Sequence, residues 1–201
     1  AGPGAQNAHP LRLLDLPAPR PLRDPRPSVL VVLPDLDFGG AQRLVESTVT
    51  GPLRERYRFE ILCLRELGGI GEDLRRRGVP VHVAGLRGWR SLRDWRLAAD
   101  VCALFRPDIV HSHLLPGDVC AWLGFGRRVP RVSTKHSVDG WMGPASRVVE
   151  RLALRGATEV VAVSNGVACA KSYLGPSGAL PLVLESPAAV PYADSPAPLF
   201  C

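Results

Sequence analysis

The chain has 201 residues, of which 46% are hydrophobic and 22% are charged, a composition typical of a folded domain rather than of a disordered chain. A domain commonly has ~100–200 residues, so one domain with terminal segments accounts for this length. The net charge of +6 comes almost entirely from arginine, and the sequence shows neither a clustered basic face nor a nucleic-acid motif, so we expect no nucleic-acid partner.

Prolines concentrate at the two ends of the chain, where 7 of the 20 lie in residues 1–27 and 6 in residues 176–201. Proline opposes both helix and sheet. We therefore expect a proline-rich N-terminal tail at 1–27, one folded domain at 28–175 and a proline-rich C-terminal segment at 176–201.

From Ser28 onward, short β-branched runs alternate with longer amphipathic stretches, the pattern of repeated β-α units in a parallel sheet. Strands are expected at 28–33, 59–64, 79–83, 108–113, 131–135 and 159–163. Helices are expected at 41–57, 72–77, 91–106, 117–125 and 145–154, and another begins at Ser164 or Asn165. Right-handed crossovers between these units predict an α/β fold with a single Rossmann-like, doubly wound parallel sheet.

No apolar run approaches the ~18–20 residues that span a bilayer, and the N-terminus lacks a signal-peptide core. We therefore expect a cytoplasmic location. The five cysteines are widely spaced and form no Cys-x-x-Cys pair, so we expect them to be small core residues in a reducing compartment rather than zinc ligands.

Ligands of open parallel sheets bind beyond the carboxyl ends of the strands. The residues that stand out there lie in 37–43, 111–113, 134–136 and 164–166. Gly39 and Gly40 join a strand to a helix and could bring backbone amides close to a diphosphate, although paired glycines are also common in simple turns. Neither a dinucleotide-binding glycine fingerprint nor a Walker loop is present, which disfavours a dehydrogenase or a nucleotide triphosphatase.

His111 and His113 alternate along a predicted strand and should share one face, where they could flank an acceptor hydroxyl or share a metal. His111 could equally be a packed core residue, and His113 and His136 could be exposed loop residues. A metal would need a third ligand, which no spacing demands, so we expect no metal and no other cofactor.

Basic and aromatic residues occur together at 89–96, and Arg147, Arg151 and Arg155 recur along one predicted helical face. Such features suit peripheral docking to an anionic membrane at its inner face. They also suit a solvated helix with core tryptophans.

The ordered set of motifs resembles the N-terminal domain of family-4, retaining glycosyltransferases with the GT-B fold. The matching pieces are Val29–Leu33 followed by Gly39–Arg43, then Arg106–His113, Val132–His136 and Ala157–Ser164. The resemblance implies transfer of a sugar from a nucleotide-sugar donor to the hydroxyl of a sugar or lipid-linked acceptor, with retention. It also implies that a donor-binding domain, in cis or in trans, completes the site.

The resemblance implies roles for individual residues. Gly39 and Gly40, with a contribution from Arg43, would bind the donor diphosphate. His113 would lie beside the reacting sugar as the catalytic residue. Its task would be to position and polarise rather than to remove a proton. On the acceptor side, the implied residues are His111, Lys135 and His136.

The chain departs from the family pattern near its end. Asn165–Gly166 comes earlier than the family's usual Asn-Gly turn, and no segment carries the glutamate motif of a donor-binding domain. Two alternatives therefore stay open beside the acceptor-side domain of a hexosyltransferase. They are a non-catalytic binding module with the same fold and a basic domain that binds membrane surfaces.

Overall fold

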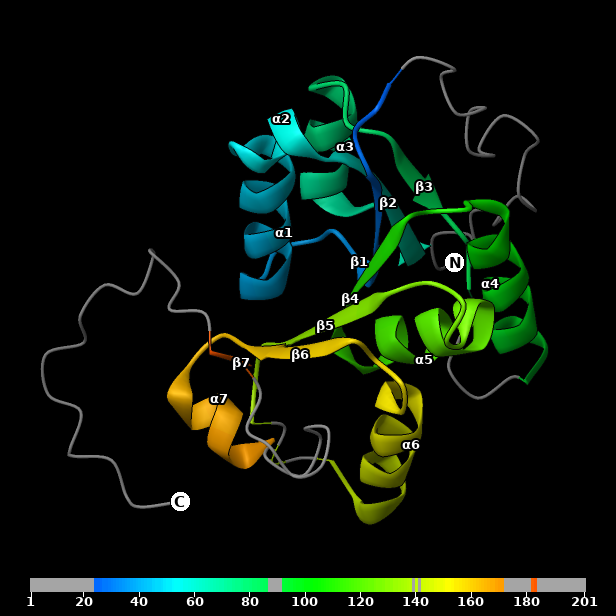
Figure 1. Cartoon of the computed structure of the whole chain (residues 1–201), viewed down its shortest axis with the longest axis vertical. Helices are drawn as coiled ribbons and strands as arrows, with labels where there is room; N and C mark the ends of the chain where they lie inside the picture. The colour runs from blue at the N-terminus through cyan, green and yellow to red at the C-terminus, as the bar shows by residue number, and fades with distance from the viewer. Residues whose placement is uncertain (1–23, 87–91, 139, 141, 172–181, 184–201) are drawn as a thin grey trace, which may run out of the picture.

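The computed structural model describes residues 24–86, 92–138, 140, 142–171 and 182–183. In this part of the chain, seven parallel strands form one sheet in the order β3-β2-β1-β4-β5-β6-β7 (Figure 1). The strands are β1 (Ser28–Asp35), β2 (Arg58–Glu66), β3 (Val81–Val83), β4 (Ile109–His113), β5 (Arg131–Lys135), β6 (Glu159–Ala162) and β7 (Leu182–Val183). The strand order reverses at β1, which confirms the predicted Rossmann-like, doubly wound sheet.

Helices cover both faces of the sheet. They are α1 (Gly40–Thr50), α2 (Leu53–Arg56), α3 (Gly68–Arg76), α4 (Leu92–Leu104), α5 (Leu114–Phe125), α6 (Pro144–Leu154) and α7 (Asn165–Ala170). Alternate residues of β1 enter two different cores: Leu30 packs with Cys102 and Cys120 of α4 and α5, whereas Val31 packs with Val45 of α1. Within the described residues, no helix is both long and apolar enough to cross a bilayer.

Two helices differ most from their predicted bounds, while α5 begins at Leu114 rather than at 117 and the bounds of α4 and α6 shift by one or two residues. The helix predicted over 41–57 is divided at Gly51 and Pro52, because proline lacks an amide donor and disfavours the helical conformation in the residue before it. The helix predicted over 72–77 begins earlier, at Gly68. There the amides of Ile70 and Gly71 donate to the carbonyl oxygen of Leu36 at 3.0 and 3.2 Å, which fixes α3 to the segment after β1.

The predicted tails at 1–27 and 176–201 lie largely outside the described residues. Within the second, Leu182 and Val183 form β7 and pair with β6. A two-residue strand is too short to give a periodic signal, so the sequence pattern predicts only six strands. The division into a domain at 28–175 with two tails stays a prediction.

Candidate functional site

The carboxyl ends of β1, β4 and β5 lie side by side at one edge of the sheet (Figure 1). β1 pairs with β4 through Val32 and Ser112, and β4 pairs with β5 through His113 and Thr134. Parallel pairing therefore places the segment that follows β1 beside the polar ends of β4 and β5. This edge carries most of the residues that the sequence predicts as site residues.

Three imidazole rings gather at this edge. The ring centroids of His111 and His113 are 4.2 Å apart, and those of His113 and His136 are 5.1 Å apart. Nδ1 of His113 lies 2.8 Å from Nε2 of His136, and Nε2 of His111 lies 2.8 Å from Oγ1 of Thr134. The two strand histidines thus share one face, as their alternation predicts.

Burial keeps the rings of His111 and His113 neutral. Burial, together with the nearby His136, lowers the pKa of His111 to about 4, although Asp118 opposes this shift. Burial and the neighbouring His111, His136 and Lys135 hold the pKa of His113 well below its ordinary value. A neutral imidazole has one donor and one acceptor nitrogen, so it can orient a hydroxyl from either side but adds no positive charge.

The strand β1 and His113 are held close by the first turn of α5, which begins directly after His113. A Cβ atom at Gly117 would lie 2.5 Å from the carbonyl oxygen of Val32. Only glycine allows the helix to approach β1 this closely. The close approach fixes the start of α5, which directly follows His113, against the carboxyl half of β1.

The N-terminus of α1 is suited to bind an anion. Neither a capping side chain nor an acidic residue occupies its first turn, which follows Gly39 and opens at Gly40. Unpaired backbone amides and the helix dipole make such an N-terminus attractive to a diphosphate. Arg43 is exposed and pairs with Glu46 at 2.7 Å, so its guanidinium lies on the α1 surface.

A buried network of four charged side chains lies beneath the histidines. Asp118 accepts hydrogen bonds from the hydroxyls of Ser112 and Ser133, each at 2.6 Å, and also pairs with Lys135. Nζ of Lys135 lies 3.0 Å from Oε1 of Glu150. Both carboxylate oxygens of Glu150 lie 3.0 Å from Nζ of Lys171.

The network balances two carboxylates with two ammonium groups. Burial would lower the pKa of Lys135, but the charges and hydrogen bonds of Asp118 and Glu150 outweigh it and raise the pKa above its ordinary value. Because the network joins the ends of β4 and β5 to α5, α6 and the residue after α7, it fixes the backbone from which His136 projects.

The structure brings His111, His113 and His136 together, and the shared face of His111 and His113 is the one that their alternation predicts. Lys135 is only 3% exposed and lies within the charge network. Its contact with an acceptor stays a prediction, as do the catalytic role of His113, the acceptor-side roles of His111 and His136, and the diphosphate-binding roles of Gly39, Gly40 and Arg43. Sequence reasoning missed Glu150 and Lys171. The sequence contains one hint of Lys171: it and Lys135 are the only two lysines of an arginine-rich chain, and both enter this network.

No group of three or more histidine, cysteine, aspartate or glutamate side chains in the described residues is arranged to hold a metal ion. The cysteines Cys63, Cys102 and Cys120 are buried free thiols in the core. The chemistry that the imidazole cluster itself offers is the donation and acceptance of hydrogen bonds.

Two solved structures share this fold. One is the lipopolysaccharide outer core galactosyltransferase WaaB in its apo form, with a TM-score of 0.52, 12% identity and coverage of 75% of this chain and 43% of that chain. The other is the UDP-N-acetylglucosamine 2-epimerase from Rickettsia bellii, with a TM-score of 0.51, 8% identity and coverage of 72% and 41%. At these identities the likeness concerns the fold alone.

The chain spans less than half of the length of either solved structure. No curated protein matches it. The family model of Glycosyltransferase Family 4, by contrast, matches residues 38–170, well over half of the 201 residues, and this range includes α1 and all three site histidines. The chain therefore belongs to Glycosyltransferase Family 4.

Proposed function

We propose that the chain is the acceptor-side domain of a glycosyltransferase that moves a sugar from a nucleotide-sugar donor to an acceptor hydroxyl with retention of configuration. The observation that carries this proposal is the cluster of three imidazoles at the carboxyl edge of β4 and β5, beside the uncapped N-terminus of α1. Membership of the family supports the same class of reaction.

The N-terminus of α1 and the histidine cluster suit the negative and the positive charge, respectively, that develop during transfer. As the bond from the sugar to the diphosphate breaks, negative charge grows on the diphosphate and positive charge grows on the sugar. The amides at Gly39 and Gly40 would stabilise the former. His113, held neutral, would accept or donate a hydrogen bond at the reacting sugar and so position it.

The acceptor hydroxyl would bind on the side of His136 and His111. His136 pairs with His113, and His111 pairs with Thr134, so each ring has a fixed orientation. The carboxylates of Asp118 and Glu150 are buried and occupied by lysines, which suits them to positioning rather than to the acid and base roles of a glycosidase.

We also propose that transfer requires a second, donor-binding domain, supplied in cis or in trans. The chain spans 43% of the galactosyltransferase and 41% of the epimerase that share its fold. The 201-residue chain alone should therefore bind free nucleotide sugars weakly. Submicromolar binding of UDP-glucose, UDP-galactose or GDP-mannose in a calorimetric titration would contradict this part of the proposal.

The experiment that tests the function measures the release of nucleoside diphosphate when the domain is joined to a donor-binding domain and supplied with the same nucleotide sugars. Acceptor-dependent release that His113→Ala abolishes supports a transferase. Binding of an acceptor without release from any donor would support the alternative of a non-catalytic module.

Peripheral membrane contact is a second proposal, supported by the outer surface of α6. Val148 is 57% exposed, Val149 and Leu152 are each 42% exposed, and Arg147 and Arg151 are exposed on the same helix. Exposed apolar groups flanked by arginines suit an anionic lipid surface. Of the tryptophan-containing segment at 89–96, residues 89–91 are not described, and Trp95 of α4 packs against the core rather than standing on the surface.

A further inference from the structure

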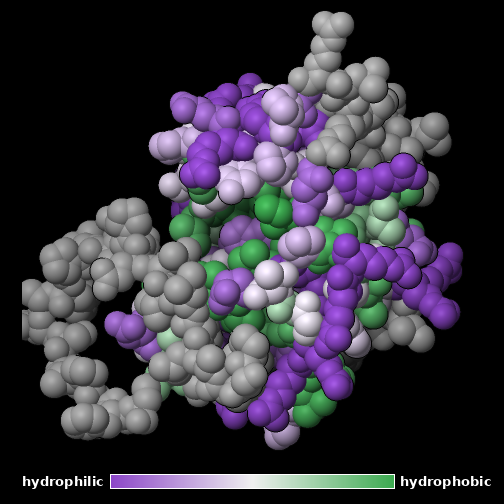
Figure 2. Space-filling model, viewed as in Figure 1, coloured by the Kyte–Doolittle hydropathy of each residue, from purple (hydrophilic) through white to green (hydrophobic). Residues whose placement is uncertain are grey.

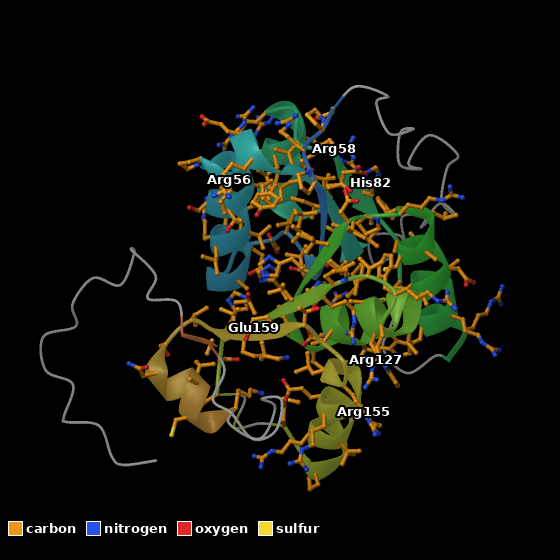
Figure 3. All side chains as sticks on the ribbon, in the orientation of Figure 1. Arg56, Arg58, His82, Arg127, Arg155 and Glu159 are labelled. Atoms are coloured by element: carbon orange, nitrogen blue, oxygen red, sulfur yellow. The ribbon has the colours of Figure 1, made fainter. Side chains whose placement is uncertain are left out.

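A polar pocket lies at the edge of the sheet opposite the histidines, where β1, β2 and β3 begin. Its volume is about 160 Å³, and four arginines line it: Arg26, Arg54, Arg58 and Arg77. Arg26 precedes β1, Arg54 lies in α2, Arg58 opens β2 and Arg77 follows α3. Hydrophilic residues dominate this upper part of the face in Figure 2, and Figure 3 shows Arg58 here, near the beginning of β1.

The remaining lining residues include no acid; they are Val49, Tyr57, Phe59, Gly78, Val79 and Pro80. Two of the arginines are neutralised by carboxylates that lie outside the lining. Arg26 pairs with Asp24 at 2.7 Å, and Arg77 pairs with Glu46 at 3.2 Å. The charge of the pocket therefore comes mainly from Arg54 and Arg58.

Within the described residues, Arg58 has a hydrogen-bond donor without an acceptor, and Arg54 has a charge without a carboxylate partner. The buried Nε of Arg58 has no hydrogen-bond partner among the residues that the structure describes. In the same residues no carboxylate lies within ion-pair distance of Arg54. Buried donors without partners are rare and costly, so a ligand that accepts hydrogen bonds there would relieve this cost.

The shape and charge of the pocket select a class of ligand. Guanidinium groups bind phosphate oxygens in a planar, paired geometry. Pockets for drug-sized ligands have roughly 300–1,000 Å³, so the present volume suits a phosphate or diphosphate group rather than a whole nucleotide. Tyr57 and Phe59 would contact the apolar part of a phosphate ester.

The N-terminal segment of the chain is a poor occupant. Residues 1–23 contain three arginines and one aspartate, so their charge has the same sign as that of the pocket. An external anion fits better.

We propose that this pocket binds a phosphate-bearing anion at a site separate from the edge that carries His113. The anion comes either from a small soluble phosphate or diphosphate, or from a phospholipid headgroup. Arg58 supplies the buried donor, and Arg54 supplies the second positive charge.

The test is a titration of the 201-residue chain with inorganic pyrophosphate, followed by the NMR shifts of backbone amides. The expected result is saturable shifts at Gly78 and Val79, in the pocket. Shifts at Gly39 and Gly40 instead would report the proposed donor site, so the two sites are read separately. Arg54→Gln and Arg58→Gln should each weaken the Gly78 response at least fivefold.

Arg93→Gln is the matched control, because it removes one exposed positive charge from α4, away from the pocket, and should leave the affinity within twofold. Arg54 lies on the exposed helix α2, so its replacement should leave the fold intact even if that of Arg58 does not. Absence of a saturable response at Gly78 and Val79, or equal weakening by all three substitutions, would overturn the proposal.

A second arm distinguishes the two sources of the anion. Vesicles of phosphatidylcholine with phosphatidic acid are pelleted with the protein in the presence and absence of pyrophosphate. If both Arg54→Gln and added pyrophosphate lower the fraction of protein that pellets, the anion is a lipid headgroup. If neither Arg54→Gln nor pyrophosphate changes the pelleted fraction, while the shifts at Gly78 and Val79 are saturable, the anion is a soluble phosphate.

Discussion

Nδ1 of His113 lies 2.8 Å from Nε2 of His136, although the two residues are 23 positions apart. His136 directly follows Lys135, whose ammonium is held by Asp118 and Glu150. A charge network inside the domain therefore sets the position of a ring at its edge. The catalytic proposal depends on this rigid support, because a positioning group must be held within a fraction of an ångström.

Gly40→Asp separates donor binding from folding. A Cβ atom at Gly40 would meet nothing within 4 Å, and a carboxylate in the first turn of a helix is favourable, so the melting temperature should stay the same or rise. The added charge should repel the diphosphate and raise the KM for the nucleotide sugar at least tenfold in the completed enzyme. Ser47→Asp, which adds the same charge to the exposed surface of α1, is the control; an equal KM for both variants would rule out the glycine site.

Stability should depend on pH through His111. The pKa of His111 is about 4 in the folded protein because burial disfavours its charged form, whereas its ordinary value is 6.5. Between these values the unfolded chain binds more protons, so the contribution of His111 is complete above about pH 6.5 and is lost as the pH falls toward about 4. In urea unfolding at several pH values, the free energy of unfolding should fall less steeply with decreasing pH for His111→Asn than for the unmodified protein. Identical slopes would mean that His111 does not titrate in this way.

The buried network should be sensitive to the loss of one partner. Glu150→Gln leaves the ammonium groups of Lys135 and Lys171 without this carboxylate, and breaking a buried ion pair typically costs ~3–5 kcal/mol. Glu159→Gln, at an exposed position of β6, should change the free energy of unfolding by no more than ~0.5 kcal/mol. Chemical denaturation measures both values. A cost for Glu150→Gln as small as that of the control would show that the network contributes little.

The membrane proposal predicts an effect at Val148. Val148→Asp should reduce pelleting with anionic vesicles at low salt at least fivefold, because it places a charge on the exposed apolar surface of α6. Leu104→Asp makes the same change on α4, where Leu104 is 53% exposed, and should have little effect. Failure of the unmodified protein to pellet would remove membrane contact from the proposed function.

Much of the fold follows from local patterns in the sequence. The apolar run after Ser28 and the alternation of His111 and His113 predict β1, β4 and the shared face of the two rings, because strand geometry has a period of two. β5 has the predicted bounds, Arg131–Lys135. The carboxyl edge of the sheet follows in turn from the parallel topology.

Other features depend on tertiary contacts that no local pattern contains. The early start of α3 depends on the carbonyl of Leu36, more than thirty positions away, and Gly68 has φ +68 next to the same backbone. The pairing of Glu150 with Lys171 depends on the approach of α6 to the residue after α7, 21 positions further along the chain. The arginine pocket, likewise, is formed by three stretches of the chain that lie apart in the sequence: Arg26, residues 49–59 and residues 77–80.

The turnover of the completed enzyme with and without the His113 imidazole tests the central claim most directly. His113→Ala should lower kcat by ~100-fold or more, the scale observed when a positioned polar group is removed from a transition state, while the domain keeps its unfolding free energy within ~2 kcal/mol. Arg93→Gln should keep full turnover. If His113→Ala retains turnover within twofold of the unmodified enzyme, the histidine edge of the sheet is not the site of sugar transfer.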